Sequence, residues 1–147
     1  MTKDNLRAFV AVYLVLTREE EILLLKRCNT GYQDGNYSLV AGHLNGRETT
    51  KQGIIREAYE EAGITLLPKD LKVIHVMHRN SPGREYFDIF LTASIWSGEI
   101  TNMEPHLCDE LKWFSIHELP NNMIPEVKHA LENINKKVCF GEFGWIE

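Results

Sequence analysis

The sequence lacks the features that mark several large protein classes. Cysteine is scarce: Cys28, Cys108 and Cys139 are odd in number and widely spaced, which fits neither a disulfide framework nor a zinc ribbon. Basic residues are outnumbered, with 16 Lys and Arg against 21 Asp and Glu and a formal net charge of -5. This balance argues against nucleic acid bound through general basicity. Free thiols fit a reducing compartment, and we expect a cytoplasmic protein.

Apolar runs long enough to cross a membrane as a helix are also missing. The run from Ala8 to Leu16 ends at a charged segment, well short of the roughly 20 residues that a membrane helix needs. It has no small-residue cleavage site of the kind that ends a signal peptide, so we read it as a buried strand. With 44% hydrophobic and 25% charged residues, the composition is globular. We expect residues 1–147 to form a single domain.

Apolar segments separated by turn-forming residues predict an α/β fold. We expect strands over 7–16, 21–27, 38–41, 71–78, 85–96 and 110–116, with the first two and the 71–78 and 85–96 pair joined as hairpins. Two helices are predicted, over 50–62 and 125–136, and strands interspersed with helices indicate a layered architecture. The aromatic tail over 139–147 is expected to dock, on the core, beside the substrate or on a second subunit.

The helix predicted over 50–62 has well-signalled ends and one apolar side. Thr49 and Gln52 have capping-box spacing at its start, and Gly63 can take a left-handed conformation after its last turn. At the helical period, one side carries the apolar residues Ile54, Ile55, Ala58 and Ala62. The segment is therefore predicted to pack that side on the core.

Acidic residues occupy the other side of this helix, where local physics disfavours them. Glu57, Glu60 and Glu61 stand at i, i+3 and i+4, and like charges at such offsets cost roughly 0.2–0.5 kcal/mol a pair. Two of them lie in the last turn, where the helix dipole prefers cations. A solvated acidic face is one explanation. A divalent cation is the other, and carboxylate-rich ligation suits Mg²⁺ or Mn²⁺ rather than zinc.

The spacing around this helix resembles a known signature. From Gly42 to Ile64 the chain runs GHLNGRETTKQGIIREAYEEAGI. This resembles the Nudix box, G-x5-E-x7-R-E-U-x-E-E-x-G-U, of the Nudix hydrolase family and its MutT-like branch. Every invariant letter matches, and only Ala58 departs, where a bulky aliphatic residue is expected. The likeness extends more loosely over residues 7–136, and it implies an α/β/α sandwich with a mixed sheet between helices.

The resemblance also implies a chemistry and a set of roles. Nudix hydrolases cleave a phosphoanhydride bond in a nucleoside diphosphate linked to another group X, with Mg²⁺ or Mn²⁺. Glu57, Glu60 and Glu61 match the metal-binding glutamates, and Glu57 also matches the general base proposed for the MutT-like branch. Arg56 matches an arginine that braces the ligands, and Glu48 matches its partner carboxylate.

Further metal ligands are expected outside the helix. The backbone carbonyl of Ala41 matches a ligand that stands just before the box. MutT-like members take another glutamate from a loop after a long strand. Glu104 is the candidate by spacing, with Asp109 and Glu110 as alternatives.

Candidates for contact with the substrate are less clearly marked. Arg27 ends a strand that faces the expected cleft, and Arg79 flanks a hairpin turn; for both, an ordinary surface charge is the alternative. Gly42 and Gly46 would let the loop backbone pass close to a bound group. Tyr32 and Tyr37, in the loop before the box, are placed either to stack on a base or to pack.

The substrate itself is not specified by these residues. The compact chain favours a (d)NTP or modified nucleotide over ADP-ribose, a nucleotide sugar or a dinucleoside polyphosphate. A non-catalytic, nucleotide-sensing Nudix domain is the alternative of another class, and the intact carboxylate set argues for an enzyme. Isopentenyl diphosphate isomerase is disfavoured because the cysteines lack its context, and mRNA decapping because the chain has no basic tract. We expect a small nucleotide as the partner, neither nucleic acid nor membrane, and leave a homodimer open.

Overall fold

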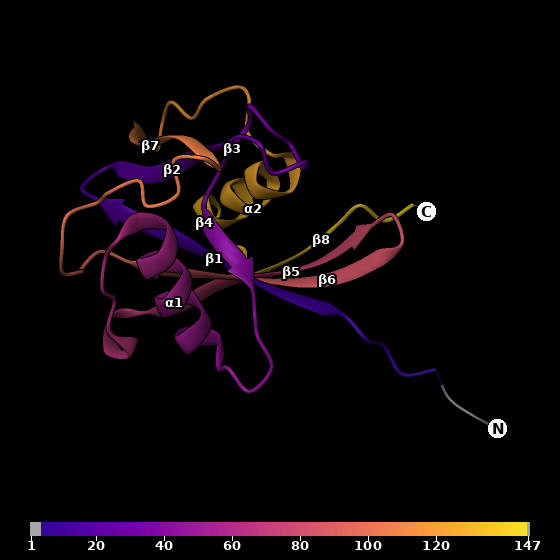
Figure 1. The fold of residues 1–147 in the computed structure, drawn as a ribbon. Coiled ribbons are helices and arrows are strands. Elements are labelled where there is room, and N and C mark those ends of the chain that lie inside the picture. Colours follow the sequence, from indigo (N-terminus) through magenta and orange to yellow (C-terminus); the bar gives the residue numbers. More distant parts are fainter. Residues whose placement is uncertain (1–3, 147) are drawn as a thin grey trace.

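The computed structural model describes residues 4–146 and places a mixed sheet between two helices (Figure 1). The helices are α1 (Thr50–Ala62) and α2 (Pro125–Asn135), and a short 3-10 helix spans Pro68–Asp70. The strands are β1 (Phe9–Arg18), β2 (Glu21–Arg27), β3 (Tyr37–Ser38), β4 (Val40–His43), β5 (Lys72–Ser81), β6 (Arg84–Ala93), β7 (Cys108–Ser115) and β8 (Phe140–Phe143). The predicted α/β sandwich with a mixed sheet is confirmed.

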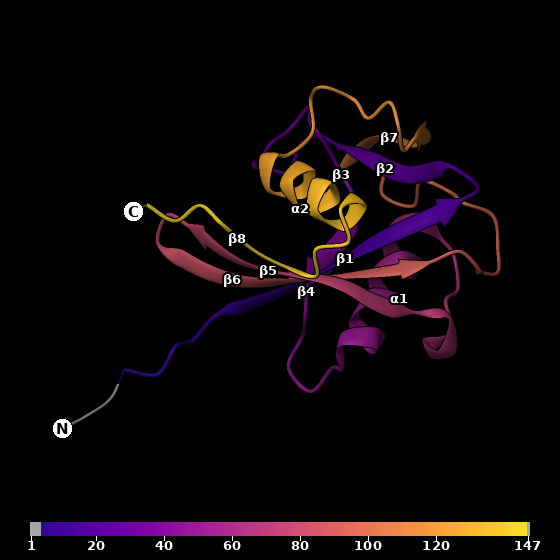
Figure 2. The same ribbon diagram turned by 180° about the vertical axis from the view of Figure 1, so that it is seen from behind.

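Strand β1 connects the two parts of the sheet. The strand order is β3-β2-β1-β6-β5-β8, with β4 paired to β1 and β7 paired to β2. β1 runs parallel to β6 over most of its length, antiparallel to β4 through its middle, and antiparallel to β2 only at its end. The long β5–β6 hairpin, with β8 beside it, extends away from the rest of the molecule (Figures 1 and 2).

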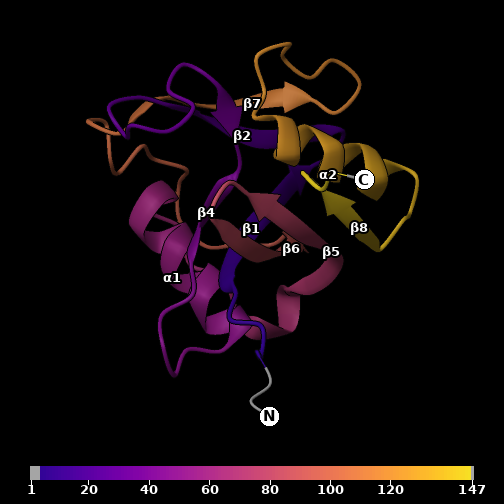
Figure 3. The same cartoon turned by 90° about the vertical axis from the view of Figure 1, so that its right-hand side faces the viewer.

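Both faces of β1 are buried, because a helix covers each side of the sheet (Figure 3). Alternate residues of a strand point to opposite faces. One set packs in the cluster under α1, namely Val12, Leu14 and Leu16. The other set packs in the cluster under α2, namely Ala11, Tyr13 and Val15. The N-terminal apolar run is thus a buried strand, as predicted, and within residues 4–146 no helix is long and apolar enough to span a membrane.

Helix α1 has the predicted bounds and the predicted caps. The Gln52 backbone N–H donates to the Thr49 hydroxyl at 3.1 Å, and the Gln52 side chain accepts from the Thr49 N–H at 2.9 Å. At the other end Gly63 is left-handed, with φ of 69°, and its N–H donates to the Tyr59 carbonyl. Ile54, buried within α1, anchors the apolar side.

Several predicted strand bounds are wrong. The first strand covers Phe9–Arg18 rather than 7–16, the hairpin strands cover Lys72–Ser81 and Arg84–Ala93, and β7 begins at Cys108. The strand predicted over 38–41 is two short strands, since Tyr37–Ser38 pairs with β2 whereas Val40–His43 pairs with β1. Strand ends depend on pairing partners distant in sequence, which propensity alone does not reveal.

The aromatic tail docks on the sheet, one of the expected alternatives. Residues Phe140–Phe143 form β8, parallel to β5, and the Val76 N–H donates to the Cys139 carbonyl at 2.9 Å. Phe143 packs against the cluster under α2, and the Trp145 indole N–H donates to the His78 carbonyl at 3.0 Å. The tail thus covers the edge of β5 and part of the core.

Deleting residues 139–147 should destabilise the fold. Loss of one packed aromatic side chain costs about 2 kcal/mol, and about 2–4 °C of melting temperature corresponds to each kcal/mol in a chain of this size. We expect a drop of at least about 4 °C in thermal denaturation followed by circular dichroism. Ile146→Ala is the control, because Ile146 is 96% exposed. Unchanged melting of the truncated chain would contradict the docking.

Candidate functional site

The guanidinium of Arg56 gathers acidic side chains from α1 and from the loop before it. Nε and Nη2 donate to the two carboxylate oxygens of Glu48 at 2.6 and 2.9 Å, a bidentate pair. Nη1 donates to Glu57 at 2.6 Å and to Glu60 at 3.3 Å. Nη2 also donates to the His43 carbonyl of β4 at 3.1 Å. Arg56 therefore links the loop, the helix and the sheet.

The contact with Arg56 lowers the pKa of the Glu48 carboxyl group. The guanidinium, together with the Asn45 backbone N–H that donates to the same carboxylate, lowers the pKa of Glu48 to about 2. Glu48 is therefore ionised throughout the physiological range and keeps Arg56 in place. Glu48, which the resemblance matched to the partner carboxylate of Arg56, thus contacts Arg56 directly.

Glu57 lies against the backbone of Gly42. A Cβ added at Gly42 would overlap the Glu57 carboxylate, so only glycine leaves room for it. Burial raises the pKa of Glu57, and the charges of Glu60 and Glu104 add to this effect while Arg56 opposes it. A Cβ at Gly46 would meet nothing within 4 Å, so the close approach expected there is not observed.

Glu61 is partly buried with little to balance its charge. One oxygen accepts from the Ala41 backbone N–H at 2.9 Å. Burial raises the pKa of Glu61 well above its ordinary value, and the neighbouring charges of Glu57 and Glu104 raise it further. Local physics would favour a neutral side chain here, so the negative charge of this cluster needs another explanation than stability.

The donor set fits a divalent cation, although the side chains do not converge on one point. Among residues 4–146, no three His, Cys, Asp or Glu side chains are arranged to hold an ion. Glu57 is turned to Arg56 and Gly42, and Glu61 to the Ala41 N–H. The donors are nonetheless oxygens that repel one another, which is the chemistry that Mg²⁺ or Mn²⁺ relieves.

The structure distinguishes among the three residues after β6 that were candidates for a further metal ligand. Glu104 lines a cavity of about 310 Å³ together with Glu61, and its charge acts on both Glu57 and Glu61. Glu110 instead accepts a hydrogen bond from the Tyr37 hydroxyl at 2.9 Å, and Asp109 lies beside the thiol of Cys28. Position therefore favours Glu104.

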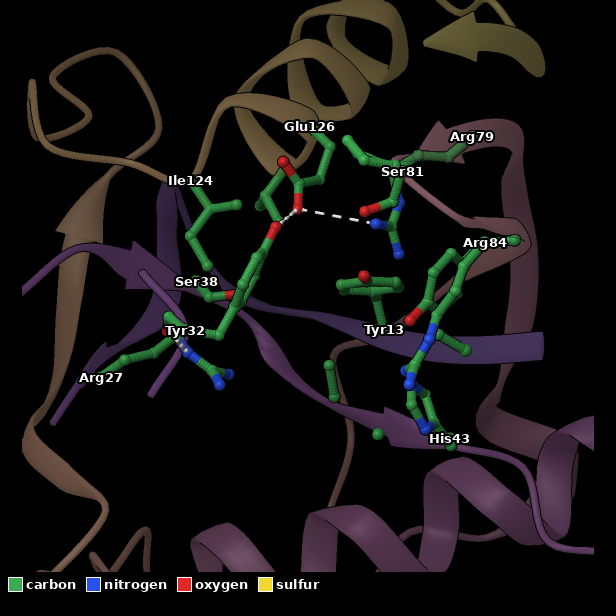
Figure 4. A pocket seen from close by; sticks show the side chains of 16 residues that line it. Tyr13, Arg27, Tyr32, Ser38, His43, Arg79, Ser81, Arg84, Ile124 and Glu126 are labelled. Carbon is green, nitrogen blue, oxygen red and sulfur yellow. Dashed lines mark hydrogen bonds and ion pairs between the residues drawn. The ribbon is translucent and has the colours of Figure 1, made fainter. Parts of the chain in front are cut away.

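A larger cavity has a volume of about 470 Å³, and Figure 4 shows the side chains that line it. Its wall includes Ala41 and Gly42. The N–H of Ala41 donates to Glu61, and Gly42 lies against the Glu57 carboxylate, so the cavity adjoins the acidic cluster. Arg27 lines both this cavity and the smaller one, so it stands between them. Two of the three residues predicted to contact a substrate, Arg27 and Gly42, therefore lie where the cavities approach the carboxylates.

Arg79, the third, lies deeper than predicted. It is 7% exposed, and Nε and Nη2 donate to the fully buried carboxylate of Asp88 at 2.6 and 3.1 Å. Of the two interpretations of Arg79, the ordinary surface charge is wrong, because the β5–β6 pairing sets Arg79 diagonally opposite Asp88 under the cavity. Contact with a substrate stays a prediction. Tyr13 and Glu126 also line the cavity and were missed. Asp88, an acid inside an apolar strand sequence, was the one available signal.

The two tyrosines of the loop before the box differ in role. Tyr32 lines the larger cavity, and its hydroxyl donates to Glu126, another residue of the lining, at 2.5 Å. Tyr37 is buried in the core under α2, so packing accounts for it. Of the pair, only Tyr32 is placed to contact a ligand.

Replacing Glu61 should stabilise the chain at high pH in a chelator. The folded pKa of Glu61 is raised, so wild-type stability falls as pH rises from the ordinary glutamate value through the folded one. Glu61→Gln keeps an oxygen for the Ala41 N–H and carries no charge. We expect the variant to have the higher urea midpoint at pH 8 in EDTA, with the gap closing towards pH 4. A lower midpoint at pH 8 would contradict this account.

Known proteins resemble this chain in sequence and in fold. An NAD-capped RNA hydrolase, NudC of Pseudomonas aeruginosa, is 27% identical over 110 residues, 75% of this chain and 37% of that protein. An ADP-ribose pyrophosphatase of Methanocaldococcus jannaschii is 26% identical over 111 residues, 76% of this chain and 64% of that protein. A MutT Nudix hydrolase structure from Burkholderia pseudomallei is 26% identical, with a TM-score of 0.78 over 86% of this chain and 97% of that one.

The matches differ in how much of each protein they cover. The chain spans 37% of the length of the NudC relatives, so its likeness to them is to one part of a longer protein. The family model for the NUDIX domain, in contrast, matches residues 7–134, most of this chain and all of the acidic cluster. The chain belongs to the Nudix family.

Proposed function

We propose that this chain is a divalent-cation-dependent hydrolase that cleaves a phosphoanhydride bond in a nucleoside diphosphate linked to another group. The observation that carries the proposal is the position of the carboxylate cluster of α1 beside a nucleoside-sized cavity, with Arg27 in the wall of both that cavity and the smaller one that Glu61 and Glu104 line. Its relatives bear the names of hydrolases that act on such bonds. Nudix hydrolases use divalent cations and nucleotide-type substrates, which fits the oxygen-rich donors.

Each part of the site has a role in this proposal. Mg²⁺ or Mn²⁺, held by Glu57, Glu60, Glu61, Glu104 and the Ala41 carbonyl, would neutralise phosphate charge and lower the pKa of a water. Arg27 would bind phosphate oxygens where the cavities meet. Glu57, whose pKa burial raises, is suited to take a proton from the attacking water. Arg56 and Glu48 act through their contacts, because they fix the carboxylates.

We propose a (d)NTP or modified nucleotide as the substrate, in an enzyme formed by residues 1–147 as one domain. The larger cavity, of about 470 Å³, has room for one nucleoside. ADP-ribose, nucleotide sugars and dinucleoside polyphosphates are the alternatives, and the ADP-ribose pyrophosphatase relative supports the first of these. A turnover screen over all four classes with Mg²⁺ or Mn²⁺, with product analysis, decides among them. No turnover of any class would favour a nucleotide-sensing domain.

Replacing Glu57 or Glu60 tests the acidic cluster. Glu57→Gln and Glu60→Gln should each lower kcat at least about 100-fold, as expected for a lost proton acceptor or metal ligand, without unfolding the chain. Glu132→Gln, the same change at an exposed position of α2, is the control. Steady-state kinetics with a circular dichroism check measure both effects. Near-full activity of either cluster variant would remove that residue from the site.

A methyl group at Gly42 tests whether the position of Glu57 matters. In Gly42→Ala the new Cβ would displace the Glu57 carboxylate, which is the flexible end of a side chain, so stability should change by less than about 1 kcal/mol. Activity should fall at least about 10-fold, because a displacement of about 1 Å is enough to impair a catalytic group. Gly46→Ala, in the loop that follows β4 and in open space, should be neutral. Equal activity of the two variants would contradict the proposal.

A further inference from the structure

The wall of the larger cavity presents two charged groups that are close but not hydrogen-bonded to each other. Nη1 of Arg79 lies 3.9 Å from a carboxylate oxygen of Glu126, and both residues are 7% exposed (Figure 4). Buried charges are costly unless they are well paired. The arrangement therefore leaves a donor and an acceptor side by side at the wall of a cavity.

Contacts with Asp88 and Tyr86 hold the Arg79 guanidinium in a fixed position. Two of its nitrogens donate to Asp88, and its guanidinium carbon lies 4.0 Å from the centre of the Tyr86 ring. These contacts fix the plane of the guanidinium and occupy Nε and Nη2, so Nη1 is the nitrogen directed to Glu126 and the cavity. A donor that is fixed in advance binds an acceptor without loss of side-chain freedom.

Glu126 and Tyr32 provide two acceptors next to this donor. The Tyr32 hydroxyl donates to Glu126, and its oxygen keeps lone pairs with which it can accept. Burial and the neighbouring carboxylate raise the pKa of Tyr32 to about 12, so the hydroxyl keeps its proton at neutral pH. Glu126 lies in the first turn of α2, where the helix dipole favours a negative charge.

We propose that Arg79, Glu126 and Tyr32 select a nucleobase that carries an exocyclic amino group, a specificity that rests on the proposed function. The two amino hydrogens donate to the Glu126 carboxylate and the Tyr32 oxygen. The unprotonated ring nitrogen beside the amino group, N3 of cytosine or N1 of adenine, accepts from Nη1 of Arg79. The aliphatic side chains of Ile124 and Val127 line the same cavity and offer apolar contact to the base.

The proposal predicts discrimination against deaminated bases. Uracil differs from cytosine, and hypoxanthine from adenine, in that a carbonyl group replaces the amino group. A carbonyl oxygen would face the Glu126 carboxylate and the Tyr32 oxygen and would leave a buried acceptor without a donor. Sites that hydrogen-bond a polar group reject an analogue lacking it far more strongly than apolar pockets reject a missing methylene.

Binding of nucleoside monophosphates tests the selection without any turnover. Calorimetry should show CMP binding at least about 10-fold more tightly than UMP, and AMP at least about 10-fold more tightly than IMP. In Glu126→Gln the amide can turn its NH₂ to a carbonyl, so both preferences should fall to within about threefold of unity. Tyr32→Phe, which removes one acceptor from an exposed loop, should reduce them partly. Glu132→Gln, on the same helix, should leave them unchanged.

The outcomes separate this inference from the proposed function. Equal affinity within both pairs, no binding of any of the four, or an equal loss for all four in Glu126→Gln would overturn the selection. Hydrolysis of triphosphates with no preference within either pair would also overturn it and leave the proposed function standing. Clear discrimination among monophosphates with no hydrolysis of any nucleotide would support the selection and remove the proposed function.

Discussion

The acidic side of α1 depends on the guanidinium of Arg56. Glu57 and Glu60 repel each other across one helical turn, and the C-terminal end of the helix adds its own negative potential. Arginine can balance them because its N–H groups spread in a fixed plane, with one edge on Glu48 and one nitrogen shared by the two helix glutamates. A lysine has a single charged nitrogen and would not span this arrangement.

This balance is incomplete, and the remaining charge collects at Glu61. One guanidinium faces Glu48, Glu57 and Glu60, whereas Glu61 receives a single backbone N–H. Two carboxylates with raised pKa values therefore lie side by side, each raised first by burial. Groups perturbed in this way gather at functional sites, because the fold gives up stability to hold charge for a partner. The cavities beside them supply the space for one.

The local signals of the sequence were enough to predict α1 and its acidic side. Capping residues, the left-handed Gly63 and the helical period all act within a few residues, so the bounds of α1 and the grouping of its glutamates followed directly. Glu104 could be ranked above its rivals only by spacing. The structure adds a physical reason, since it shares a cavity with Glu61 while Glu110 is tied to Tyr37.

The charged residues under the larger cavity, Arg79, Asp88 and Glu126, form its floor. Their grouping could not be predicted, because it depends on contacts between distant segments. Arg79 and Asp88 meet through the register of β5 and β6, and Tyr13 joins them because β1 runs parallel to β6. Glu126 looked like an ordinary acid at the start of a helix. The tail had a compositional signal for docking, but its parallel pairing with β5 depends on an edge that the sequence does not mark.

The composition of that floor bears on how this family diversifies. Relatives at 26–27% identity carry names with different substrates, NAD-capped RNA and ADP-ribose, so a shared fold does not fix the substrate. Apolar side chains of similar volume would often stabilise a core more than a buried ion pair does. Yet the chain places Arg79, Asp88 and Glu126 under the cavity, where each is at most 7% exposed. A polar floor that costs stability is accounted for if the cavity distinguishes ligands by their hydrogen-bonding edges, while α1 supplies the chemistry common to them all.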